Sequence, residues 1–168
     1  MRPSEAFAVL GIEPRFEIAA RELRAAWMRR AAAAHPDAAG AVDESARVND
    51  AMRILADPIQ RAQALLELRG GRVAGTRALP QAFLLEMMEL RERADAAAGD
   101  SAAIAALRAE AADRREGEIA RIAEAFASMK DGAIDAAAIE DSILVIRAFD
   151  RMVEQLAREE SGARGDAP

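Results

Sequence analysis

The sequence contains no cysteine and no tyrosine, and it has only one histidine. Without cysteine the chain can form no disulfide, no thiolate site and no cysteine-held iron–sulfur cluster, and a single histidine argues against a structural zinc site. The histidine, His35, stands near Asp37, but no nucleophile beside them completes a triad or an acid–base pair. We therefore predict a protein with no catalytic residues, no bound metal and no cofactor.

Positive charge and long apolar runs are also scarce. The chain has 23 lysines and arginines against 29 aspartates and glutamates, and its formal net charge is −6. A protein that follows a nucleic-acid backbone needs a broad basic face. No charge-free segment reaches transmembrane length, and the first residues lack the sustained apolar core of a signal peptide. These features predict no nucleic-acid partner, no membrane partner and a cytoplasmic location.

Helix-forming residues dominate the composition. Alanine, leucine, glutamate and arginine are abundant, whereas glycine and proline gather at a few points, which predicts an all-α fold. Apolar residues recur at spacings of three and four between those points. The predicted helices cover approximately residues 4–10, 18–34, 42–56, 59–68, 80–98, 101–130 and 135–160. We predict that Ser4 caps the first helix and that Trp27 and Phe149 lie in cores.

The second predicted helix is rich in arginine and ends at His35-Pro36-Asp37. Each arginine alone is typical of a solvated helix face, but Arg24, Arg29 and Arg30 as a group could align against an acidic surface. Proline fixes its own φ and keeps the preceding residue out of the helical region, so the histidine and the aspartate should project from a rigid turn. We interpret the tripeptide as a contact made on another protein. The plainer alternative is an ordinary helix end.

The helix predicted at 80–98 carries two apolar strips. Phe83, Met87, Leu90 and Ala94 form the first strip, which is enough to seat the helix in a bundle. The second strip and its acidic neighbours comprise Leu84, Leu85, Met88, Glu89 and Glu92. Such a strip is typical of a protein-binding surface, to which the adaptable thioether of methionine is suited. The pattern supports equally well the alternative that neighbouring helices bury both strips.

The order of these segments resembles a known family. A short helix, an arginine-bearing helix, His35-Pro36-Asp37 and a third helix resemble a J-domain, the module by which co-chaperones stimulate a DnaK-class chaperone. More narrowly, four segments resemble the HscB family, which serves iron–sulfur cluster assembly, and the resemblance covers most of the chain, from Phe7 to about Leu156. The four segments are Val48-Asn49-Asp50-Ala51, Leu55-Ala56-Asp57-Pro58, Arg61-Ala62-Gln63-Ala64-Leu65-Leu66 and Phe83-Leu84-Leu85-Glu86-Met87-Met88-Glu89-Leu90-Arg91-Glu92.

The resemblance implies an all-α fold in two parts. An N-terminal J-domain, which is an antiparallel helix hairpin with short helices, would cover residues 1–70, and a linker would follow at 71–80. A C-terminal three-helix bundle that binds a scaffold protein would cover 81–160, before a disordered tail at 161–168. The resemblance also implies an L-shaped arrangement of the two parts.

The resemblance implies two protein partners as well. The J-domain would stimulate the ATPase of an HscA- or DnaK-class chaperone, and the bundle would deliver an IscU-type iron–sulfur scaffold protein to it. The implied chaperone-binding residues are Arg24, Arg29, His35, Pro36 and Asp37. The implied scaffold-binding residues are Leu84, Leu85, Met88, Glu89 and Glu92.

The chain departs from the family pattern at three points. Ala34 stands where an aromatic residue is usual, Arg30 stands where an apolar residue is usual, and the stretch from Asp37 to Val48 is shorter. Arg30 requires either a slight rotation of the helix or a stem that snorkels to solvent. One alternative function is therefore a chaperone-independent helical adaptor with a degenerate J-domain. Another is a small enzyme that uses His35 and Asp37 as an acid–base pair.

Overall fold

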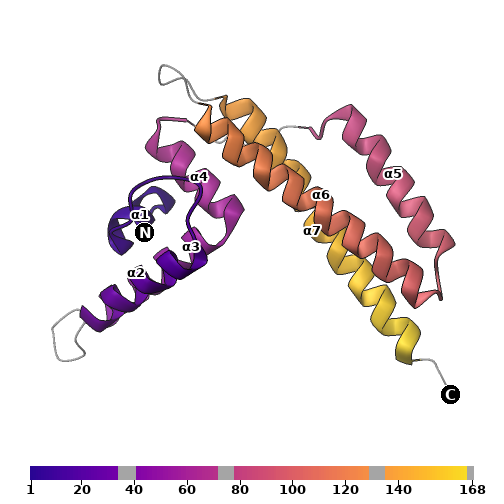
Figure 1. Ribbon diagram of the computed structural model, residues 1–168, viewed down its shortest axis with the longest axis horizontal. Coiled ribbons are helices and arrows are strands. Elements are labelled where there is room, and N and C mark those ends of the chain that lie inside the picture. The colour runs from indigo at the N-terminus through magenta and orange to yellow at the C-terminus, as the bar shows by residue number, and fades with distance from the viewer. Residues whose placement is uncertain (34–40, 72–77, 129–134, 166–168) are drawn as a thin grey trace. The chain divides into compact units, whose positions relative to one another are not determined.

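The structure is a computed structural model that describes residues 1–33, 41–71, 78–128 and 135–165 (Figure 1). All regular elements within these ranges are helices, which confirms the predicted all-α class. They are η1 (Pro3–Glu5), α1 (Ala6–Leu10), α2 (Ala20–Ala33), α3 (Ala41–Ala56), α4 (Pro58–Leu68), α5 (Gln81–Ala96), α6 (Ser101–Ala127) and α7 (Ala136–Gly165).

Local signals in the sequence account for several helix ends. Gly11 ends α1 in the left-handed region, with φ 66°, where a residue without a Cβ is favoured. Asp57 precedes α4, and its Oδ1 accepts a hydrogen bond from the Gln60 backbone N–H at 2.9 Å. Pro58 follows as the first helical residue, where its missing N–H costs no helical hydrogen bond. These ends lie where the sequence predicts them.

Three predicted boundaries need correction. Ser4 does not cap the first helix, because it lies inside the 3-10 turn η1, at the start of which the Arg2 backbone N–H donates to the Glu5 carboxylate at 3.2 Å. The second helix begins at Ala20 and not at Ile18. The last helix continues to Gly165, beyond the predicted end at 160, so it includes residues 161–165 of the segment predicted as a disordered tail.

The chain divides into two compact units, of which the first comprises Met1–Val73 and Ala123–Ala136. Its core is built from apolar residues of α1 to α4, since each of these helices buries at least one face. The buried residues include Phe7, Leu10, Leu23, Val48, Leu55, Leu65 and Leu66. Leu65 and Leu66 are adjacent and both buried, because α4 is covered on more than one side.

Helices α2 and α3 pack against each other in antiparallel directions. Leu23, early in α2, lies beside Met52, late in α3, whereas Arg30, late in α2, lies beside Glu44, early in α3. Trp27, between them, is only half-buried, and its indole Nε1 donates a hydrogen bond to Asn49 Oδ1 at 2.9 Å. The prediction that Trp27 is a core residue is therefore wrong, and its polar edge explains why.

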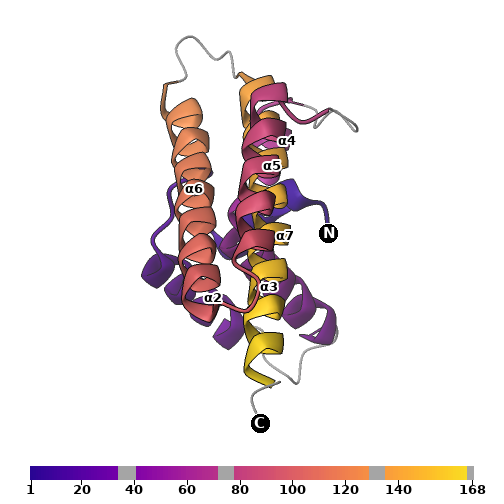
Figure 2. The same cartoon turned by 90° about the vertical axis from the view of Figure 1, so that its right-hand side faces the viewer.

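The second unit comprises Ala74–Ile122 and Ala137–Pro168, and within it α5, α6 and α7 run alongside one another (Figure 2). Each helix contributes to one apolar cluster, so the unit is the predicted three-helix bundle. The cluster contains Phe83, Leu90, Ala94, Ile104, Leu107, Ala111, Val145, Ala148, Phe149, Met152 and Leu156. The rings of Phe83 and Phe149 meet edge to face, with centroids 5.2 Å apart, which confirms the prediction that Phe149 is a core residue.

Among the described residues, no helix combines the length and the apolar character that a membrane span requires. The longest helices, α6 and α7, both contain several charged residues.

Candidate docking surfaces

The first candidate surface is the outer face of α2. The helix carries four arginines and one glutamate, Glu22, whose carboxylate is occupied by Arg15 at 2.6 Å. Arg24 and Arg29, which the sequence analysis singles out, are both exposed. No carboxylate within the described ranges forms an ion pair with either of them. The surface is therefore basic although the chain as a whole is acidic.

The other residues predicted for this surface, His35, Pro36 and Asp37, lie outside the described residues. Ala33, the last described residue before them, is also the last residue of α2. The docking role of the tripeptide stays a prediction.

Arg30 shows how an arginine is accommodated at a position where an apolar residue is usual. Its side chain is exposed and lies over Gly11, where an added Cβ would be 3.0 Å from Arg30 Nη2. Gly11 caps the C-terminus of α1, where the helix dipole favours a positive charge. Two possibilities were raised for Arg30, a slight rotation of the helix or a stem that snorkels to solvent. The structure shows the second, because the side chain is exposed.

The second candidate surface is the outer face of α5. Leu84, Leu85 and Met88 are 45%, 60% and 60% exposed, whereas Phe83 and Leu90, on the opposite face, are 6% and 4% exposed. The sequence pattern left open whether neighbouring helices bury both apolar strips of this helix. The exposed fractions decide this question, since the strip with Phe83 and Leu90 is buried and the strip with Leu84, Leu85 and Met88 is not. Glu89 and Glu92 are also exposed and adjoin the strip. The five residues predicted for scaffold binding therefore share one accessible face.

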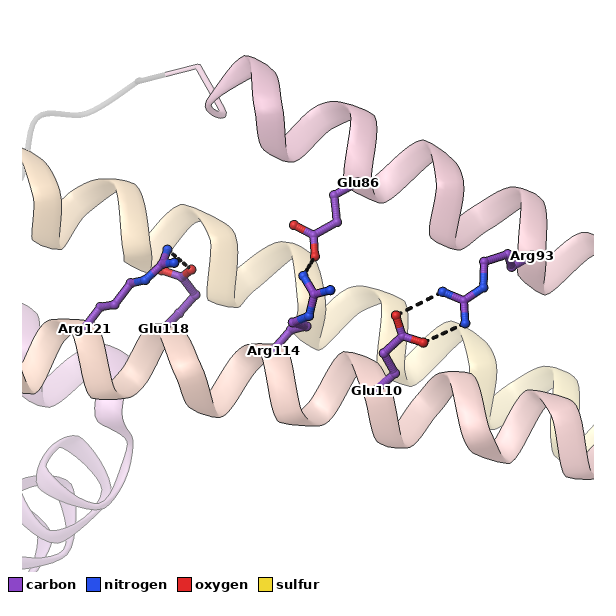
Figure 3. Close-up of polar contacts among 6 residues, drawn as sticks. All are labelled: Glu86, Arg93, Glu110, Arg114, Glu118 and Arg121. Atoms are coloured by element: carbon purple, nitrogen blue, oxygen red, sulfur yellow. Dashed lines mark hydrogen bonds and ion pairs between the residues drawn. The ribbon is translucent and has the colours of Figure 1, made fainter.

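Ion pairs hold α5 against α6 beside this face (Figure 3). Arg93 donates two hydrogen bonds to the Glu110 carboxylate, at 3.0 and 2.7 Å, and Arg114 pairs with Glu86. A third link runs to α7, where Arg91 donates to Gln155 Oε1 at 3.1 Å. These contacts help to fix the rotation of α5 about its axis, which determines the side chains that it presents outward.

The Arg93–Glu110 contact has an electrostatic consequence. The hydrogen bonds from Arg93 lower the pKa of the Glu110 carboxyl, and the same contact raises the pKa of Arg93. Both shifts favour the charged forms, as expected for a paired contact of opposite charges.

Sequence reasoning did not find these ion pairs. The partners are 17 and 28 residues apart and lie on different helices, so no local spacing identifies them. The only signal is that Glu86 and Arg93 lie one position away from the apolar strip on the same side of α5, where contact with a neighbouring helix is possible.

A metal centre has no candidate in the part of the chain that the structure describes, because no three histidine, aspartate or glutamate side chains come together there. The two candidate surfaces consist of apolar and charged side chains that are exposed among the described residues.

Comparison with known proteins identifies the fold and the family. Residues 79–156 match the family model described as the HSCB C-terminal oligomerisation domain. The co-chaperone protein HscB homolog of Bordetella petrii is 35% identical over 175 residues, which cover 98% of this chain and 98% of that protein. The solved structure of the chaperone HscB from Vibrio cholerae aligns with a TM-score of 0.75 at 24% identity, over 94% of this chain and 98% of that chain. The human co-chaperone protein HscB aligns with a TM-score of 0.78 at 21% identity, over 92% of this chain and 81% of that chain.

The two structural alignments show that the fold is that of HscB proteins, with an N-terminal J-domain and a C-terminal helical bundle. The sequence identity to the Bordetella petrii relative extends over nearly the whole chain. This chain therefore belongs to the HscB family of co-chaperones.

Proposed function

We propose that the protein stimulates the ATPase of an HscA- or DnaK-class chaperone and delivers an IscU-type iron–sulfur scaffold protein to it. In this proposal residues 1–70 act as the J-domain, 71–80 as a linker and 81–160 as the scaffold-binding bundle, and the protein works in the cytoplasm. The observation that supports it best is the exposure of Leu84, Leu85 and Met88 on a helix whose opposite face is buried. Exposed leucine and methionine side chains grouped on one face are typical of a binding surface.

The chaperone would be engaged through charge. Arg24 and Arg29 would align the J-domain with an acidic surface, and Asp37 would pair with a cation of the chaperone beside His35 and Pro36. Binding that favours the hydrolysing conformation would shift the chaperone toward that conformation. The protein would supply no reacting group, because the bond that breaks belongs to ATP on the chaperone. It would therefore be no enzyme itself.

The scaffold would be engaged through the outer face of α5. Leu84, Leu85 and Met88 would bury apolar surface in the complex, and Glu89 and Glu92 would favour a partner with positive charge next to its apolar contact.

ATP turnover by the cognate DnaK-class chaperone tests the proposal directly. The wild-type protein should increase turnover, and His35→Gln should abolish the increase while the protein still captures the scaffold protein, because the proposed scaffold-binding residues lie on α5. Turnover that wild type leaves unchanged, with scaffold capture intact, would contradict the proposal and support a helical adaptor. Loss of both activities in His35→Gln would show that the variant is misfolded, which circular dichroism checks independently.

A further inference from the structure

Methionine is the main oxidisable side chain of this protein. The sequence has no cysteine and no tyrosine, one tryptophan and seven methionines. A hydroperoxide therefore meets no thiol that would react first, and the methionine thioethers are its principal targets. Access to solvent decides which of them react, since a sulfur atom inside a core is shielded from the oxidant.

The described methionines differ widely in exposure. Met88 and Met28 are 60% and 59% exposed, and Met1, at the N-terminus, is 43% exposed. Met152, in the core of the second unit, is only 4% exposed. A hydroperoxide should therefore reach the outer faces of α2 and α5 long before it reaches the core.

Helix α5 places its exposed methionine directly after a protected one. Met87 is half-buried and packs against the apolar cluster of the second unit, whereas Met88 lies on the outer face. The two residues are neighbours on the same helix, so a difference in their reactivity reports access and not local sequence. Oxidation of Met88 should leave the fold intact, because its side chain is mostly in solvent.

Met88 stands in the middle of the outer strip of α5. Leu84 and Leu85 lie four and three residues before it, and Glu92 lies four residues after it, so these side chains share one face. Among the five residues proposed to bind the scaffold protein, Met88 is the one that a hydroperoxide can oxidise. A change in its polarity therefore acts at the centre of the proposed contact.

Reaction with hydrogen peroxide converts the thioether into a sulfoxide. A sulfur lone pair attacks one peroxide oxygen, the O–O bond breaks and an S–O bond forms. The proton of the transferred oxygen passes to the leaving hydroxide, which departs as water, so the sulfur loses two electrons and the peroxide gains them. The new oxygen is a hydrogen-bond acceptor, and its burial against apolar surface without a donor is unfavourable. The ionised carboxylates of Glu89 and Glu92 are acceptors too and offer it no proton.

We infer that Met88 is a site of reversible oxidation, at which a hydroperoxide weakens the docking of the scaffold protein. A methionine sulfoxide reductase returns the sulfoxide to the thioether, with the oxygen leaving as water while two thiols are oxidised to a disulfide. The inference rests on the proposed scaffold-binding function of α5 and adds a chemical switch to it.

Tandem mass spectrometry after graded treatment with hydrogen peroxide tests the site itself. In the full-length protein, Met88 and Met28 should gain one oxygen atom before Met87 and Met152 do, and fragment ions separate the two neighbours on α5. Oxidation of Met87 as early as Met88 would overturn the inference, because the outer face would then give no selectivity.

Titration calorimetry with a purified IscU-type scaffold protein tests the consequence. This protein is oxidised at Met88, freed of peroxide and only then mixed with the scaffold protein, so that the scaffold protein never meets the oxidant. The Kd should rise roughly tenfold or more, and treatment with the reductase should restore it. The measured quantity is the ratio of the Kd values after and before oxidation, so a variant's own affinity does not affect the comparison.

Two leucine variants locate the effect. The ratio should fall to one in Met88→Leu, which has no sulfur at this position, and should stay as in wild type in Met28→Leu, which removes the equally exposed methionine of α2. A raised ratio in Met88→Leu would place the damage at another methionine and overturn the inference. Circular dichroism of the oxidised protein should match that of the untreated protein, and lost helicity would overturn it as well.

The inference and the proposed function fail in different ways. If the untreated protein binds the scaffold protein and oxidation at Met88 leaves the Kd unchanged, the inference is overturned and the proposed function stands. If the untreated protein does not bind the scaffold protein, both are overturned.

Discussion

Helices α2 and α5 are built in the same way but carry opposite charge. Each buries a leucine that is 4% exposed, Leu23 in α2 and Leu90 in α5, and each presents a methionine outward, with Met28 59% and Met88 60% exposed. The arginines of α2 surround the first methionine, whereas Glu89 and Glu92 follow the second. Apolar contact alone would not distinguish two partners, so in the proposed function the difference in charge would determine which partner each helix attracts.

The two helices also differ in how their charged side chains are used. In α5, Glu86 and Arg93 are paired with α6 and hold the helix in place. In α2, Arg24 and Arg29 have no ion-pair partner within the described residues, and only Glu22 is paired, with Arg15. Charges that stabilise the fold are already satisfied, whereas unpaired charges of one sign are available to a partner.

The largest expected effect comes from the buried leucines. Leu23→Ala and Leu90→Ala should each lower the free energy of unfolding by about 2–5 kcal/mol, because each leaves a cavity in a core. Met28→Ala and Met88→Ala should change it by no more than about 0.5 kcal/mol, since their side chains are mostly in solvent. Urea unfolding followed by circular dichroism measures all four variants. A loss above about 2 kcal/mol for either methionine variant would show that its surface is part of a core.

The next effect concerns the apolar strip of α5. Replacement of Leu84 and Met88 together by alanine should weaken scaffold binding by about 2–3 kcal/mol, or roughly 30- to 150-fold, because both side chains would be buried in the complex. Titration calorimetry with the purified scaffold protein measures this loss, and thermal unfolding of the variant should be nearly unchanged. Met28→Ala is the control on the other helix, and weaker scaffold binding by that variant would break the assignment of one partner to each helix.

A smaller effect is expected from the exposed charges. Arg24→Gln with Arg29→Gln should slow association with the chaperone roughly tenfold at low salt, and Glu89→Gln with Glu92→Gln should do the same for the scaffold protein. Both differences should disappear near 1 M salt, where the screening length is about 3 Å. Stopped-flow or surface-binding kinetics measure the rates. If either pair slowed association with both partners, charge would not separate the two surfaces.

The sequence predicts the helices better than it predicts exposure. Asp57-Pro58 and Gly11 mark helix ends because capping and left-handed backbone geometry depend on the residue itself. The inner strip of α5 follows from spacing alone. The exposure of Leu84, Leu85 and Met88 does not, because the pattern cannot show whether a neighbouring helix covers them. The half-burial of Trp27 depends likewise on Asn49, 22 residues away.

The residues of the candidate surfaces also differ in whether local sequence or tertiary packing determines them. Arg24, Arg29 and the residues of the α5 strip can be named from their positions on helices. The ion pairs beside the α5 strip cannot be found in this way, because Glu110 and Arg114 belong to α6 and meet α5 only through the packing of the bundle. Position on a helix is local information, whereas contact between two helices is tertiary.

The smallest expected effect concerns the ion pair that holds α5 to α6. Hydrogen bonds from Arg93 lower the pKa of Glu110 in the folded state, so as the pH falls the unfolded chain binds a proton at this residue before the folded chain does. The contribution of the pair to stability is therefore complete above the ordinary glutamate pKa of about 4.3 and is lost as the pH falls through the lowered value.

Glu110→Gln should be slightly less stable than wild type at pH 7, and the difference should shrink at acidic pH and in high salt, because the pair is largely exposed. Urea unfolding at pH 7 and pH 3 measures it, with Asp113→Asn, an exposed position on the same helix, as the control. A difference between Glu110→Gln and wild type that stayed the same at both pH values would mean that the ionised carboxylate does not hold α5 in place, and the contrast between paired charges on α5 and unpaired charges on α2 would lose its basis.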